Sequence, residues 1–118
     1  MAQTKYIKTA QAEKTGGGFI AGKAFAQMAY AALEEMPNVA TDPKAKINKE
    51  SGINIRLAKE ITCWINQGMP ILFIHVQIRK DENASSLAKG LQQEISEQIL
   101  SLTEIPSCQV NIKIDGIF

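Results

Sequence analysis

The spacing of apolar residues switches between helical and alternating along this chain, and this switch limits the folds that it can adopt. In the first half, apolar side chains recur every three or four residues, at Phe25, Met28, Ala29, Ala32, Leu33 and Met36. That spacing places them on one face of a helix. Pro37 follows directly, and a proline disfavours helical backbone in the residue before it. The sequence therefore predicts an amphipathic helix that ends near residue 36.

Alternation of apolar and polar residues begins after the polar, lysine-rich segment 41–52, which is predicted to be a loop. It covers residues 53–57, 61–65 and 71–78, and it returns in residues 108–118. A period of two is typical of strands that bury one face. Asn66, Gln67 and Gly68 favour a tight turn between the second and third of these strands. Residues 6–12 are expected to form a further, weakly marked strand.

A second helix is predicted between the last two strands. Asn83, Ser85 and Ser86 offer side-chain oxygens that can cap its first turn, and Pro106 lies just beyond its end. Its apolar stripe consists of Leu87, Leu91, Ile95, Ile99 and Leu102.

The predicted order of elements is β-α-β-β-α-β, with an extended central β region. Each helix carries one apolar stripe, and the simplest way to bury both stripes is to pack both helices on one face of a mainly antiparallel sheet. We therefore predict an α+β two-layer sandwich that forms a single domain over residues 1–118, with residues 1–18 as a lead that can be flexible. A chain of 118 residues is long enough to build its own core.

Composition excludes some classes of protein. The formal charge is +1, whereas nucleic-acid-binding domains usually carry a strongly basic face. The N-terminal residues lack an apolar stretch typical of a signal peptide, and the longest apolar run, 69–74, is far shorter than a membrane span. Cys63 and Cys108 lie in apolar stretches without a CxxC motif, so we expect reduced, buried thiols in a cytoplasmic protein.

The glycine-rich segment 15–24, TGGGFIAGKA, resembles a phosphate-binding loop. Gly17, Gly22 and Lys23 match most of the pattern G-x-x-x-x-G-K-[ST]. The next residue is Ala24, which has no hydroxyl for Mg²⁺, and no apolar strand ends in an Asp that would complete the magnesium site. The segment is therefore interpreted as a hinge into the first helix.

No catalytic, cofactor-binding or metal-binding residue is predicted. His75 is the only histidine, so a His-based metal site cannot be built from this chain alone. The carboxylates fall on polar helix faces or helix ends. Trp64, Phe73 and His75 lie on predicted strands at positions that a sheet can expose, and they form the candidate interaction surface.

A nucleic-acid-binding α+β module is the alternative interpretation, because such modules share this order of strands and helices. The GxxG loop of KH domains and the RNP1 pattern are both absent from the sequence. Lys44, Lys46 and Lys49 belong to the densest basic region, where a solvated loop is the simpler interpretation.

Three segments together resemble the alkaline shock, or general-stress, proteins of Gram-positive bacteria. FAQMAYAALEEMPNVA is similar to the first helix of that family. MPILFIHVQIRKDENASSLAKGLQQEISEQI is similar to its strand, turn and second helix, and CQVNIKIDGIF to its closing strand. The chain departs from the family at Asn38, where a glycine is common, and by extra residues within the segment 58–68. It therefore resembles a divergent member.

This resemblance implies a non-enzymatic interaction or scaffold protein in cell-envelope or general stress homeostasis. It implies protein partners, a membrane-embedded anchor protein among them, and self-association. Such a protein is cytoplasmic and reaches the membrane through a partner, without inserting into it. The family has no established catalytic residues that match positions of this chain.

Overall fold

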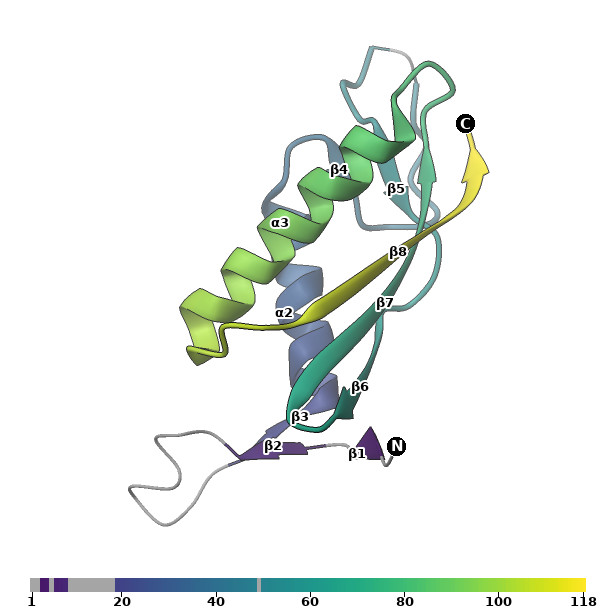
Figure 1. Cartoon of the computed structure of the whole chain (residues 1–118). Helices are drawn as coiled ribbons and strands as arrows, with labels where there is room; N and C mark the ends of the chain where they lie inside the picture. Colours follow the sequence, from purple (N-terminus) through teal and green to yellow (C-terminus); the bar gives the residue numbers. More distant parts are fainter. Residues whose placement is uncertain (1–2, 5, 9–18, 49) are drawn as a thin grey trace.

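The computed structural model describes residues 3–4, 6–8, 19–48 and 50–118 (Figure 1). Ten elements follow one another along these residues: β1 (Gln3–Thr4), β2 (Tyr6–Lys8), β3 (Phe19–Ala21), α2 (Gly22–Glu35), β4 (Val39–Ala40), β5 (Ile55–Leu57), β6 (Thr62–Asn66), β7 (Met69–Ile78), α3 (Ala84–Thr103) and β8 (Gln109–Ile117).

The strand β7 is the centre of the main sheet. It pairs with β8 in parallel along residues 71–78, so β8 occupies one edge of β7. Both β6 and β5 pair with β7 in antiparallel fashion, β6 along residues 69–73 and β5 along residues 76–78. These two short strands therefore share the other edge of β7, one after the other. Beyond them, β1 pairs with β6 and β4 pairs with β5.

The sheet is mixed, and the predicted α+β class is confirmed. The chain leaves β7, passes through the helix α3 and enters β8 in the same direction as β7, because a crossover of this length returns the chain to the end where β7 began. In Figure 1, α2 and α3 lie to the left of β7 and β8.

One hydrophobic core joins the helices to β7. The even-numbered side chains of β7 are buried, whereas Phe73 on the alternate face is 37% exposed. The same cluster contains the buried residues of both helices: Phe25, Ala29, Ala32, Leu33, Leu91, Ile95 and Ile99. The apolar faces predicted for the helices and for the strand thus pack together in one hydrophobic core.

Local signals in the sequence account for the ends of several elements. The side chain of Asn83 accepts a hydrogen bond from the backbone N–H of Ser86 at 3.0 Å, which confirms Asn83 as the N-cap of α3. The turn between β6 and β7 consists of Gln67 and Gly68, which have φ angles of 52° and 78°. Positive φ at both positions is the requirement of a two-residue hairpin turn, and glycine meets it without strain.

The N-terminal region differs from the prediction. Only Tyr6–Lys8 of the expected first strand forms a described strand, and it pairs with β3 rather than with the main sheet. Residues 9–12 lie outside the described residues. The strands β3 and β4 were not predicted, because segments of two or three residues are too short to show a period. Leu102, assigned to the apolar stripe of α3, is 56% exposed near the end of that helix.

None of the helices in the described residues combines the length and the apolar character that crossing a membrane requires.

We expect Leu72→Ala to lower the free energy of unfolding by about 2–5 kcal/mol, because it opens a cavity in the core. Leu72 is 0% exposed. Leu102→Ala removes the same atoms from a largely exposed position, so its cost should stay within about 1 kcal/mol. Urea denaturation of both variants measures the difference. Equal losses would contradict the assignment of these two residues to core and surface.

Candidate functional site

The three residues predicted as an interaction surface lie on the same face of the sheet. Trp64 is opposite Ile71, and Thr62 is opposite Phe73, in the pairing of β6 with β7. Side chains of opposite residues point to the same face, and alternate residues of a strand share a face. Trp64, Phe73 and His75 are therefore on the side of β7 that faces away from the core. Trp64 is 45% exposed.

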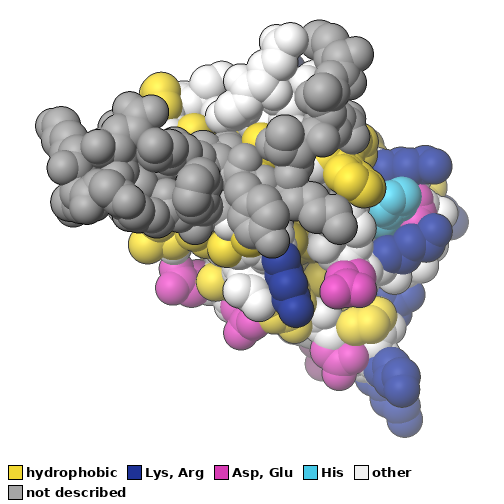
Figure 2. Space-filling model, turned by 90° about the horizontal axis from the view of Figure 1, so that it is seen from below, with side chains coloured by type: hydrophobic (Ala, Val, Ile, Leu, Met, Phe, Trp, Pro, Cys, Tyr) yellow, Lys and Arg dark blue, Asp and Glu magenta, His cyan; other side chains and the backbone are white. Residues whose placement is uncertain are grey.

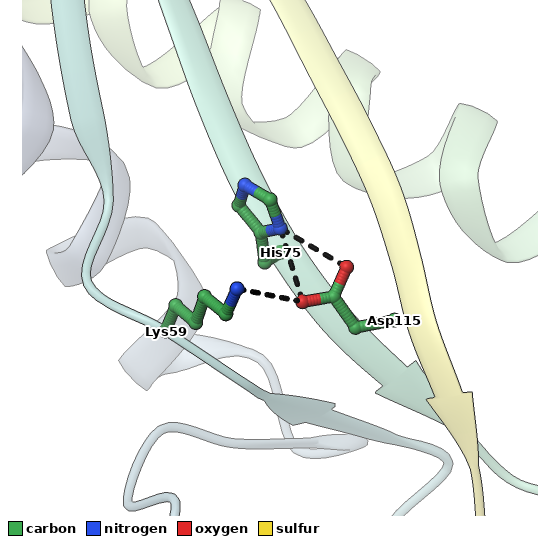
Figure 3. Close-up of polar contacts among 3 residues, drawn as sticks. All are labelled: Lys59, His75 and Asp115. Carbon is green, nitrogen blue, oxygen red and sulfur yellow. Dashed lines mark hydrogen bonds and ion pairs between the residues drawn. The ribbon is translucent and has the colours of Figure 1, made fainter.

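The side chain of His75 contacts the carboxylate of Asp115, which comes from β8. Its Nδ1 lies 3.0 Å and 3.1 Å from the two carboxylate oxygens of Asp115. The Nζ of Lys59 lies 3.7 Å from Oδ2 of the same carboxylate. Figure 3 shows the three side chains directed toward one another, His75 from β7, Asp115 from β8 and Lys59 from the segment between β5 and β6.

An irregularity in β8 places Asp115 at this position. In the pairing with β7, Val76 is opposite Ile114 and Gln77 is opposite Gly116, so Asp115 is an extra residue. A bulge of this kind redirects a side chain and often occurs at a sheet edge. Here the bulge directs the Asp115 carboxylate toward His75.

The surroundings of Asp115 favour its charged form. The hydrogen bond from His75 is the largest cause that holds the pKa of the Asp115 carboxyl below its ordinary value. The positive charges of Lys59 and Lys113 act in the same direction, while partial desolvation opposes them. We call the surface formed by Trp64, Phe73, His75, Lys113 and Asp115 the open face.

A second polar contact lies at the end of this face near the C-terminus. The guanidinium group of Arg56 donates hydrogen bonds to Oε1 of Gln77, one of them from Nε at 2.7 Å. The same guanidinium group lies 5.4 Å from the centre of the Phe118 ring, within the range of a cation–π contact. These contacts hold the side chains of Arg56 and Gln77 against the sheet.

The pair of His75 and Asp115 can orient an imidazole, but the described residues place no nucleophile beside it. Cys63 is opposite Leu72, whose side chain is buried in the core, and Ser85 and Ser86 lie in α3. Within the described ranges, no group of three or more His, Cys, Asp or Glu side chains is arranged to hold a metal ion.

Both cysteines have free thiols, and each is only partly buried. They were expected to be buried. Burial still raises the pKa of the Cys63 thiol to about 11, because it disfavours the thiolate. Cys108 lies near α3, with its Sγ 3.5 Å from Oγ of Ser96.

No phosphate-binding site can be described in the glycine-rich segment 15–24 or in the lysine-rich segment 41–52. Gly17 lies outside the described residues, while Gly22 begins α2 and Lys23 is exposed in its first turn. Lys44 and Lys46 are exposed in the segment between β4 and β5, as predicted for a solvated loop. Lys49 also lies outside the described residues.

Asp115 and Lys59 were missed by the sequence analysis. The alternation of the last strand placed Asp115 on a polar face, but 40 residues separate it from His75. Only the parallel pairing of β7 with β8 brings them together.

Comparison with family models, with curated proteins and with solved structures finds no match to this chain. The resemblance to the alkaline shock proteins therefore stays a prediction from the sequence.

We expect Asp115→Asn to lower the unfolding temperature near pH 7 and to lose this effect in acid. A carboxyl group whose folded pKa is lowered stabilises the fold above its unfolded pKa of about 3.9, and this contribution disappears as the pH falls through the folded pKa. Thermal unfolding of wild type and variant between pH 3 and pH 7 measures the difference. Asp81→Asn, in the exposed turn after β7, is the control and should show no such convergence.

We expect the Cys63 thiol to react slowly with iodoacetamide. A thiol with a pKa of about 11 holds roughly a hundredfold less thiolate at pH 8 than one at the ordinary value of 9.0. The variant Cys108→Ser leaves Cys63 as the only thiol, and its alkylation rate should rise about tenfold per pH unit up to pH 10. The urea-unfolded variant gives the reference rate. Equal rates for folded and unfolded protein at pH 8 would contradict the raised pKa.

Proposed function

We propose that this protein is a non-enzymatic interaction protein that works through self-association and protein partners at the open face. The observation that carries the proposal is the exposure of Trp64 and Phe73 next to one another on a sheet face that faces away from the core. A few residues contribute most of the binding energy in many protein interfaces, and tryptophan is among the residue types enriched at those positions.

The chemistry of the open face suits a protein interface. Trp64, Ile71 and Phe73 form an apolar centre across β6 and β7. Polar and charged groups lie beside this centre, since His75 contacts Asp115 and Asp115 contacts Lys59. An apolar centre with a polar rim is the usual composition of an interface between proteins.

The side chains around His75 support a role other than catalysis. An acyl- or phosphoryl-transfer site needs a nucleophile or a metal next to its base. The imidazole of His75 contacts the Asp115 carboxylate, which in turn contacts Lys59, and this network orients the imidazole without supplying either function.

The cellular role follows from the resemblance of the β7–α3 segment and of the closing strand to the alkaline shock proteins. The protein acts in cell-envelope or general stress homeostasis, in the cytoplasm, and a membrane-embedded partner protein brings it to the membrane. Its self-association increases the number of partner sites in one assembly, which strengthens binding to a partner that is itself clustered.

We expect the double variant Trp64→Ala and Phe73→Ala to remain folded and to lose self-association. Both side chains are partly exposed, so their removal costs much less than removal of a core residue. Sedimentation equilibrium of wild type and variant over a wide concentration range measures the dissociation constant, which should rise at least tenfold.

Leu100→Ala is the control, because Leu100 is 46% exposed on α3, away from the open face. It should leave the dissociation constant unchanged. A wild-type protein that stays a monomer at high concentration would contradict the proposal. Binding to single-stranded RNA or DNA that falls steeply with salt, and that weakens with Lys44→Ala and Lys46→Ala, would favour the nucleic-acid-binding alternative.

A further inference from the structure

Arg56 lies at one end of the open face. In the pairing of β5 with β7, it is opposite Gln77. The two neighbours of Arg56 in β5, Ile55 and Leu57, are buried in the core. Because side chains alternate along a strand, the side chain of Arg56 is on the outer side of the sheet, on the same face as His75.

Two contacts fix the guanidinium group of Arg56. Its Nε donates a hydrogen bond to Oε1 of Gln77 at 2.7 Å, and its Nη2 donates to the same oxygen. The group also lies 5.4 Å from the centre of the Phe118 ring. The side chain of Gln77 is itself confined, because a Cβ atom at Gly116 would lie 3.4 Å from its Nε2. One edge and one face of the guanidinium group are therefore occupied.

The remaining edge of the guanidinium group keeps its hydrogen-bond donors. A guanidinium group has five N–H groups in a planar fork, and the contacts with Gln77 use the edge formed by Nε and Nη2. The edge formed by Nη1 and Nη2 presents two parallel N–H groups, and this geometry binds a carboxylate with two hydrogen bonds. Among the described residues, the ion pairs join Asp115 to His75 and to Lys59, and Arg56 takes part in neither.

The charges on the open face favour a negatively charged partner. Lys113 is exposed and is opposite His75 in the pairing of β8 with β7, so Lys113 and Arg56 flank β7 on its two sides. Asp115 contributes a negative charge, but Lys59 already contacts it. Figure 2 shows Lys and Arg side chains on both sides of the histidine, with hydrophobic side chains next to them. An excess of positive charge on one surface attracts anionic groups.

The exposed aromatic side chains lie at the other end of this face. Phe73 is four residues before Gln77 on the same side of β7, which is roughly 13 Å along an extended strand. Trp64 lies beside Phe73, on β6. Past Trp64, the apolar surface continues into a groove between α2 and β6, which Tyr30 also lines. An apolar side chain at this end and an acidic group at Arg56 can therefore bind at the same time.

We propose that the open face binds an acidic segment of a partner protein, in which Arg56 holds a Glu or Asp carboxylate while Trp64 and Phe73 contact a large apolar side chain. This inference rests on the proposed function, because it names the class of partner for the same face. An extended segment rises by the same distance per residue as β7. Its apolar and acidic residues are therefore four positions apart.

The position of Asp115 favours a protein segment over a nucleic acid. The Asp115 carboxylate contacts His75, which lies between Phe73 and Gln77 along β7. A nucleic acid strand carries a phosphate at every nucleotide, so it would bring negative charge next to this carboxylate. A protein segment can place one carboxylate at Arg56 and neutral residues beside Asp115.

The probe is the peptide Phe-Ser-Gly-Ser-Glu with blocked ends. The fluorescence of Trp64, the only tryptophan, measures its binding to the full chain at a protein concentration where sedimentation shows the monomer. We expect saturable binding that is at least tenfold tighter than that of Phe-Ser-Gly-Ser-Gln, because the amide cannot accept both hydrogen bonds of the fork. Absence of a saturable change, or equal affinity for the two peptides, would overturn the proposal.

Two substitutions test the fork of Arg56. Arg56→Lys keeps the positive charge and removes the two parallel N–H groups, whereas Gln77→Glu keeps the shape of the side chain and places a carboxylate against Arg56. Each should weaken binding of the Glu peptide at least tenfold, and thermal unfolding checks that each variant is folded. Lys89→Gln, at an exposed position of α3, lowers the net charge as much as Gln77→Glu and should leave binding unchanged. Equal effects of these two changes would indicate general charge attraction and overturn the proposal.

A single-stranded thymidine oligonucleotide tests the other class of partner. Tighter binding than that of the Glu peptide, with the same loss in Arg56→Lys, would assign the face to a nucleic acid and overturn the proposal. The inference and the proposed self-association can fail separately. A protein that self-associates but does not distinguish the two peptides contradicts the inference alone. A protein that stays a monomer and prefers the Glu peptide contradicts self-association alone.

Discussion

The burial of one face of β7 against both helices is the interaction on which the rest of the structure depends. Leu72, Ile74 and Val76 are almost completely buried, and they contact the same cluster as the apolar stripes of α2 and α3. Apolar burial is the main favourable term in folding, at roughly 25 cal/mol per Å². Because a strand alternates, the burial of this face directs Phe73 and His75 outward, and the open face follows from the core.

The long connection through α3 determines the polar part of that face. It returns the chain so that β8 runs parallel to β7, and the bulge at Asp115 then brings a carboxylate to His75. The same carboxylate contacts Lys59. One acidic side chain therefore links β7, β8 and the segment before β6. It gives the open face a fixed charged group next to its exposed aromatic residues.

The open face and the groove beside α2 have different physical characters, and the side chain of Trp64 belongs to both. The open face offers side chains, with Trp64 and Phe73 as exposed aromatic groups. The groove beside α2 is an apolar cavity of about 530 Å³.

The sequence by itself determined the elements whose periods extend over many residues. The helix over 25–36, the helix capped by Asn83 and the strand over 71–78 were predicted close to their observed bounds, because each buries a regular stripe. The same alternation placed Trp64, Phe73 and His75 at positions that a sheet can expose, and the structure decided that Trp64 and Phe73 are in fact partly exposed. Only the tertiary structure decided the pairing of β7 with β8, the contact of Asp115 with His75, the short strands β3 and β4, and the groove beside β6. These features depend on residues far apart in the chain or on segments too short to show a period, and local spacing carries no information about either.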